Sequence, residues 1–86
     1  MHELGIATGV LDSVVEVAKK QNCLRVKQID VVVGKKVAII DKMFEEAFNA
    51  LKELDEYELC KDAVIKTQIT DGRDVYVDKI EVEHED

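Results

Sequence analysis

Proline and tryptophan are absent from this chain of 86 residues, which has only four glycines, two cysteines and two histidines. That composition excludes a collagen-like, proline-rich or low-complexity chain. Two cysteines without a CxxC spacing make no disulfide framework, so we expect Cys23 and Cys60 to be reduced, partly buried thiols. No apolar run is long enough for a membrane-spanning helix. The first residues lack the basic and apolar regions of a signal peptide, which predicts a cytoplasmic location.

Apolar residues make up 47% of the chain and charged residues 36%. That is enough apolar material for a core, so the length and the absence of a linker predict a single domain over residues 1–86. A large enclosed active site would take residues that so small a core needs. The length therefore favours a binding module over an enzyme.

The formal net charge is −7, from 19 acidic and 12 basic residues. A surface of this charge repels phosphate backbones and anionic headgroups, which argues against nucleic acid and membranes as partners. Cations, metals and basic protein surfaces fit it better.

Hydrophobic periodicity predicts five elements along the chain. A helix is expected over 3–22 and a second over 37–54, with strands over 24–33, 63–70 and 74–83. The buried stripe of the first helix is Leu4, Ala7, Leu11, Val14, Val15 and Ala18, and that of the second is Ile40, Phe44, Ala47, Phe48 and Leu51. In the last strand, alternation predicts one face with Tyr76, Ile80 and Val82 and another with Val75 and Val77.

The order α-β-α-β-β predicts an α+β fold with two helices packed on one face of a three-stranded sheet. Asp71-Gly72 lies between the last two strands. An Asp-Gly pair suits the two positive-φ positions of a type I′ turn, which predicts that these strands form a C-terminal hairpin.

The most informative candidate for chemistry is His2. A histidine at the second position brings together the terminal amine of Met1, the amide and imidazole nitrogens of His2, and the amide nitrogen of Glu3. Deprotonated amides with an imidazole favour square-planar Ni(II) or Cu(II), and the Glu3 carboxylate adds attraction for a cation. A solvated histidine without a role is the alternative, and the same applies to His84 in the acidic tail.

Catalytic signatures are absent from the sequence. Ser13 and Cys23 have no histidine beside them, and no GxGxxG, GxxxxGK[ST] or HExxH motif occurs. We therefore expect a protein that is not an enzyme.

The opening string Met-His-Glu-Leu-Gly-Ile-Ala resembles the amino terminus of the HypA/HybF family, the nickel metallochaperones of [NiFe]-hydrogenase maturation. The strand that ends in Val33-Gly34, the Phe-containing helix around Phe44 and the last strand resemble that family in the same order. The resemblance implies that Met1, His2 and Glu3 bind Ni(II), with His2 as the central ligand. It also implies transfer of nickel to the hydrogenase large subunit with the GTPase HypB, or a role in urease maturation, and it leaves a homodimer open.

One departure from the family is large. The family carries a zinc domain with two CxxC pairs between its last two strands, whereas this chain has the short segment 70–73 there and no CxxC. Four thiolates are needed for such a zinc site, so zinc is not expected and the chain resembles a short form without the zinc domain. The alternative function is a protein-interaction module of the HypA fold that has lost metal binding.

Overall fold

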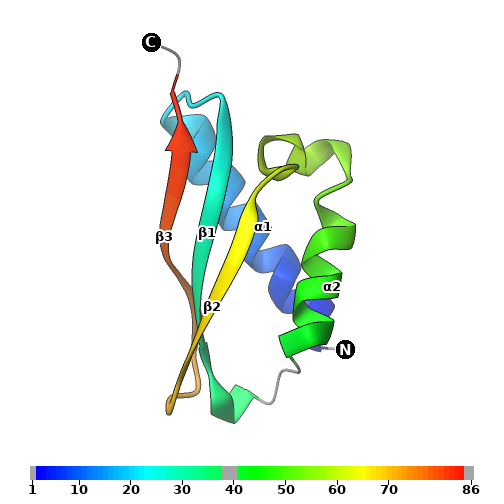
Figure 1. Ribbon diagram of the computed structural model, residues 1–86, viewed down its shortest axis with the longest axis vertical. Coiled ribbons are helices and arrows are strands. Elements are labelled where there is room, and N and C mark those ends of the chain that lie inside the picture. The colour runs from blue at the N-terminus through cyan, green and yellow to red at the C-terminus, as the bar shows by residue number, and fades with distance from the viewer. Residues whose placement is uncertain (1, 38–40, 85–86) are drawn as a thin grey trace.

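A computed structural model describes residues 2–37 and 41–84, except for the side chains of His2 and Asp41. Its main elements are helix α1 (His2–Lys20), strand β1 (Arg25–Gly34), helix α2 (Asp41–Leu51), strand β2 (Val64–Thr70) and strand β3 (Val75–Glu83). Two 3₁₀ helices, η1 (Lys35–Val37) and η2 (Asp55–Cys60), flank α2 (Figure 1). The element order and the α+β class are as the sequence predicted.

Helix α1 ends at Lys20, two residues before the end of the predicted range 3–22. Asn22 has φ 53°, a left-handed conformation that closes many helices. The Asn22 N–H donates to the carbonyl of Lys19, and the Cys23 N–H donates to that of Ala18. This pair of bonds satisfies carbonyls that the helix leaves open and turns the chain towards β1. The predicted stripe is buried from Ala7 to Ala18, but Leu4 is exposed because it precedes the packed part of the helix.

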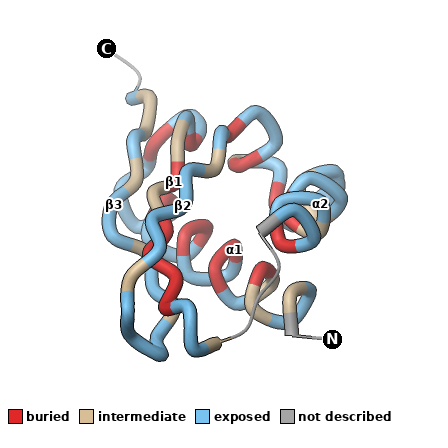
Figure 2. The backbone as a smooth tube through the Cα atoms, turned by 60° about the horizontal axis from the view of Figure 1, so that its bottom comes forward, coloured by how far each residue is buried: buried red, intermediate tan, exposed pale blue. Residues whose placement is uncertain are grey.

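Strand β1 is the centre of the sheet. The strand order is β2-β1-β3, with β2 parallel and β3 antiparallel to β1. Val26, Ile29, Val31 and Val33 point into the core, and Val32 is buried on the other face between Gln68 and Tyr76. A central strand has a neighbouring strand along each of its two edges, which suits the most β-branched segment of the chain. Figure 2 shows the resulting run of buried residues along β1.

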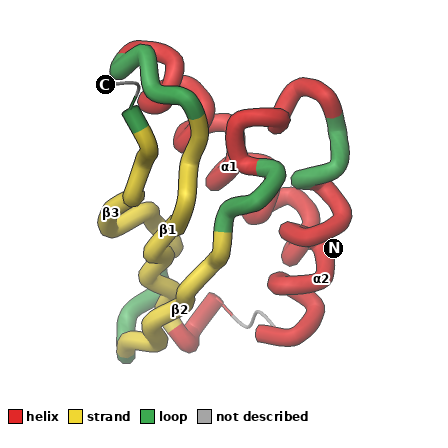
Figure 3. The backbone as a smooth tube through the Cα atoms, turned by 45° about the horizontal axis from the view of Figure 1, so that its top comes forward, coloured by secondary structure: helices red, strands yellow, loops and turns green. Residues whose placement is uncertain are grey.

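The predicted C-terminal hairpin is wrong, because β2 and β3 lie on opposite sides of β1. The connection from β2 to β3 passes over the end of β1 and must therefore span two strand spacings. A two-residue turn cannot span that distance. None of the described glycines has a positive φ, and Asp71 does not have one either, so no type I′ turn forms. Gly34 N–H donates to the Asp74 carbonyl (2.8 Å) at the crossing. Figure 3 shows this connection beside η1.

The predicted faces of β3 also need correction. Val75, Val77, Ile80 and Val82 all pack against the core, whereas Tyr76 is exposed. The pairing register with β1 shifts between Val77 and Lys79, so Asp78 is an extra residue that faces no partner. Such a bulge changes which side of the strand follows, and it brings both halves of β3 onto the same face.

The helices lie on one face of the sheet, as predicted (Figure 1). Helix α1 packs against β1 and β3, while α2 packs against α1. The ring centroids of Phe44 and Phe48 lie 5.5 Å apart in an edge-to-face arrangement, and both rings are part of the core. Helix α2 is shorter than the predicted 37–54, and Ile40 lies outside the described residues. None of the described helices has the length and hydropathy that crossing a bilayer requires.

Candidate metal centre

The predicted ligands lie at the start of α1. His2 is the first residue of the helix and Glu3 the second, while Met1 lies outside the described residues. The first backbone N–H groups of a helix have no carbonyl one turn earlier, so they take no part in its hydrogen-bond ladder. Metal coordination through backbone nitrogens in this turn therefore breaks no bond of the ladder. The positive end of the helix dipole also favours an amide nitrogen that has lost its proton.

The first turn is fixed to the rest of the molecule by its neighbours. Ala7 is completely buried, and Ile6 packs against the same core. Thr8 donates a hydrogen bond from its hydroxyl to the Leu4 carbonyl (2.8 Å). The predicted site thus sits one turn away from packed structure, on a helix whose direction the core determines.

His84 lies far from this turn. It follows β3 and is exposed. The start of α1 and the end of β3 are at opposite ends of the molecule (Figure 1). His2 and His84 of one chain therefore cannot share a metal. Over residues 2–37 and 41–84, the described His, Cys, Asp and Glu side chains form no group of three that could hold an ion.

The two cysteines are free and buried, as predicted. Cys23 donates from its thiol to the Ala18 carbonyl (3.2 Å). Burial raises the pKa of the Cys60 thiol to about 11, and the nearby Cys23 sulfur adds to the shift. A protonated, inaccessible thiol is a poor metal ligand, because binding requires the thiolate. Cys60 is therefore a core residue rather than a ligand, and Cys23 is buried in the same core.

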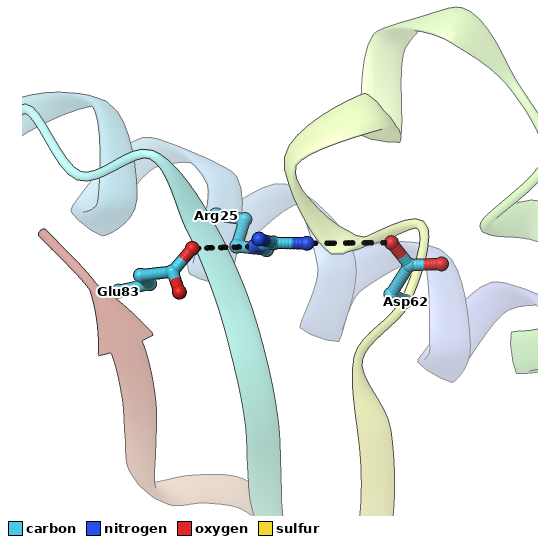
Figure 4. Close-up of polar contacts among 3 residues, drawn as sticks. All are labelled: Arg25, Asp62 and Glu83. Carbon is cyan, nitrogen blue, oxygen red and sulfur yellow. Dashed lines mark hydrogen bonds and ion pairs between the residues drawn. The ribbon is translucent and has the colours of Figure 1, made fainter. Parts of the chain in front are cut away.

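Three charged residues, Arg25, Asp62 and Glu83, lie beside one another where β1 begins and β3 ends (Figure 4). Arg25, at the start of β1, donates from Nε to the Glu83 carboxylate of β3 (2.6 Å) and lies 3.9 Å from the Asp62 carboxylate after η2. The hydrogen bond and the charge of Glu83 raise the pKa of Arg25. The sequence alone does not reveal this group, because its members meet only once β3 is known to pair with β1. The ion pair of Arg25 with Glu83 joins β1 to β3 at this end of the sheet.

A second contact missed from the sequence joins η2 to α1. The Tyr57 hydroxyl donates to the Asp12 carboxylate (2.6 Å), although the rest of the tyrosine is buried. This bond, with burial, raises the pKa of Tyr57 to about 12. The pair holds η2 against the middle of α1, away from the predicted ligands.

Comparison with known proteins identifies a family that matches most of the chain. Residues 1–68 match the family described as "Hydrogenase/urease nickel incorporation, metallochaperone, hypA". The chain is 36% identical over 74 residues to "Hydrogenase maturation factor HypA" of Methanococcus vannielii. That alignment covers 80% of this chain and 57% of the relative, so the chain spans little more than half the relative's length.

Two solved structures share the fold. The solution structure of the Ni metallochaperone HypA from Helicobacter pylori matches with a TM-score of 0.80 and 19% identity, over 96% of this chain and 98% of the other. A second solution structure of a HypA protein matches with a TM-score of 0.67 and 24% identity, over 92% and 71%. At these identities the likeness shows a common architecture.

Proposed function

The chain belongs to the HypA family, and we propose that it is a nickel metallochaperone domain for [NiFe]-hydrogenase or urease maturation, with Ni(II) held at its amino terminus. The observation that carries the proposal is the extent of the family match, which begins at residue 1 and includes Met1, His2 and Glu3. We also propose that residues 1–86 form a single domain.

The proposed ligands are nitrogens. The Met1 amine, the amide nitrogens of His2 and Glu3, and the His2 imidazole form a set that suits square-planar Ni(II). The start of α1 at His2 supports this set, because the first-turn amides lie outside the helix ladder. The Glu3 carboxylate, half-buried in the same turn, adds negative charge close to the ion. Binding releases protons, so affinity for Ni(II) falls as the pH is lowered.

The proposed activity is binding and transfer without catalysis. A site at the chain terminus leaves room for an incoming ligand from another protein. We propose a HypB-type GTPase and the hydrogenase large subunit as the proteins that exchange nickel with this chain. Zinc has no place in the proposal, because two buried cysteines are fewer than a four-thiolate site uses.

The second candidate function is a protein-interaction module of the same fold that has lost metal binding. The absence of CxxC pairs and the net charge of −7 favour it. Under this alternative, His2 would have no role and the chain would bind the same protein partners with nickel removed.

Titration of Ni(II) into untagged protein, with absorption spectra recorded, tests the proposal. We expect one ion per chain with the spectrum of planar low-spin Ni(II). Substitution His2→Ala should abolish that spectrum, whereas the matched control His84→Ala should keep it, since His84 is exposed at the other end of the molecule.

A second control separates the amine from the histidine. Acetylation of the Met1 amine removes that nitrogen from the chelate and keeps every side chain. The planar spectrum should disappear in the acetylated protein too. Equal Ni(II) affinity in the wild type and in His2→Ala would refute the proposed site and favour the interaction module.

A further inference from the structure

Asp71-Gly72 is the one place in the chain where an aspartate or asparagine precedes a glycine. The pair lies between β2 and β3, outside both strands, and both residues are exposed. The Asp71 side chain leaves 94% of its surface to solvent. The type I′ turn that the pair predicted does not form, and the proposed function makes no use of the pair.

Neither the Gly72 amide nor the Asp71 carboxyl group is locked in another contact. In the described part of the chain, the Gly72 N–H donates to no backbone carbonyl, and its one hydrogen bond is to the Thr70 hydroxyl, at 3.3 Å. The Asp71 carboxylate forms an exposed ion pair with Lys35 (3.0 Å), a kind of contact that contributes little. Glycine also has no side chain to hinder attack by its own nitrogen. The two groups can therefore react with each other.

We propose that Asp71 is a modification site, at which the side chain cyclises onto the Gly72 nitrogen and reopens as isoaspartate. In the neutral carboxyl form, the nitrogen attacks Asp71 Cγ, an N–Cγ bond forms and the C–OH bond breaks, so one water leaves with the amide proton. Water then adds to the succinimide ring. Cleavage of the N–Cγ bond restores aspartate, whereas cleavage between the nitrogen and the α-carbonyl carbon gives isoaspartate. One water leaves and one enters, so the reaction needs no oxidant or reductant and the mass of the chain is unchanged.

The place of this pair in the fold gives the modification a structural effect. The connection passes the end of β1 so closely that a Cβ atom on Gly34 would clash with the Gly72 carbonyl group. Two hydrogen bonds fix the crossing, from Lys36 N–H to the Gly72 carbonyl (3.2 Å) and from Gly34 N–H to the Asp74 carbonyl (2.8 Å). Isoaspartate brings the Cβ of Asp71 into the backbone and lengthens the connection by one atom. The longer connection should loosen both bonds, independently of nickel binding.

Timed incubation of the untagged full chain, followed by trypsin digestion and mass spectrometry, tests the site. Trypsin cleaves after Lys66 and Arg73, so peptide 67–73 contains Asp71 as its only acidic side chain. We expect a second peptide of the same mass and different retention, which increases with the time of incubation. It should accept a methyl group from an isoaspartyl methyltransferase supplied with a labelled sulfonium donor. Peptide 74–79, whose two aspartates are not followed by glycine, is the internal control.

Two variants provide matched controls. Gly72→Ala adds a Cβ atom that meets only the Thr70 hydroxyl oxygen, at 3.6 Å, and Gly72 has no positive φ, so this variant should fold as the wild type does. Its methyl group hinders ring closure, so the second peptide should be lost over the same incubation. Asp71→Glu keeps a negative charge near Lys35 but would have to form a six-membered ring, so it should lose the second peptide too.

Hydrogen exchange tests the effect on the crossing. In the isomerised chain, separated by chromatography, the Gly34 and Lys36 amides should exchange about 2- to 13-fold faster, the factor that corresponds to the loss of one hydrogen bond. The Leu24 amide, just before β1 at its other end, should be unchanged. A free peptide 67–73 that converts while the folded chain yields no second peptide, equal conversion in Gly72→Ala, or unchanged exchange at Gly34 would overturn the proposal.

Discussion

Replacement of Gly34 by alanine should be among the most destabilising small changes in this chain. Gly34 lies at the end of β1, where the connection between β2 and β3 crosses it. A Cβ atom there would lie 2.7 Å from the backbone nitrogen of Arg73 and closer still to the carbonyl of Gly72. These are backbone atoms that cannot rotate away, so the crossing segment must move.

The magnitude follows from the bonds at that crossing. Overpacking costs about 1–3 kcal/mol. Movement of the connection also strains the bonds from Gly34 N–H to the Asp74 carbonyl (2.8 Å) and from Lys36 N–H to the Gly72 carbonyl (3.2 Å), worth about 0.5–1.5 kcal/mol each. Alanine restricts the unfolded chain and returns about 0.4–1 kcal/mol. We expect a net loss of about 2–3 kcal/mol in the free energy of unfolding.

Urea denaturation followed by circular dichroism measures this loss. With a slope of about 1–3 kcal/mol per molar urea, the midpoint should fall by roughly 1 M or more. Gly5→Ala and Gly9→Ala in α1 are matched controls, because their added Cβ atoms meet nothing within 4 Å. Each should stabilise the helix by about 0.5–1 kcal/mol. A Gly34→Ala midpoint equal to that of the wild type would refute the crossing geometry.

Three further predictions concern side chains away from the candidate metal centre. Tyr57→Phe should lower the free energy of unfolding by about 1 kcal/mol at neutral pH. Because the pKa of Tyr57 is raised to about 12 from 10, its stabilisation is complete below pH 10 and disappears towards pH 12, and the phenylalanine variant should lose this part of the pH dependence. Cys60, whose pKa is raised to about 11 by burial, should resist a thiol reagent at pH 8 in folded protein and react after unfolding; rapid reaction in the folded state would contradict its burial. Arg25→Gln should speed hydrogen exchange at the Leu24 amide, which donates across to β3, while Arg73→Gln at the other end should not.

The sequence predicted the elements better than their arrangement. The period of the apolar residues identified α1 and β1, since these patterns depend on neighbours in the chain. Pairing depends on distant residues, and the local turn signal of Asp71-Gly72 suggested a hairpin that the structure does not form. Strand β1 lies at the centre of the sheet because its β-branched residues are buried best with a neighbouring strand along each edge. The bulge at Asp78 leaves no pattern of its own, so the exposed face of Tyr76 could not be foreseen.

The candidate metal centre was predicted from the first three residues of the chain alone. The structure adds the start of α1 at His2, while the ligand roles of Met1, His2 and Glu3 stay predictions. The family resemblance was confirmed by the match over residues 1–68. The charged group at Arg25 could not be predicted, because its residues come from β1, from β3 and from the connection after η2, which are far apart in the sequence.

The strand order also has a consequence for how this chain folds. Paired residues in the sheet are far apart in the sequence, from Gln28 with Val64 to Arg25 with Glu83. No two of the described strands that are joined by a tight turn pair with each other. No local hairpin can therefore act as an early nucleus for the sheet. Long loops must close before strand pairing gains any energy, so formation of the sheet should limit the folding rate, with the helices forming first.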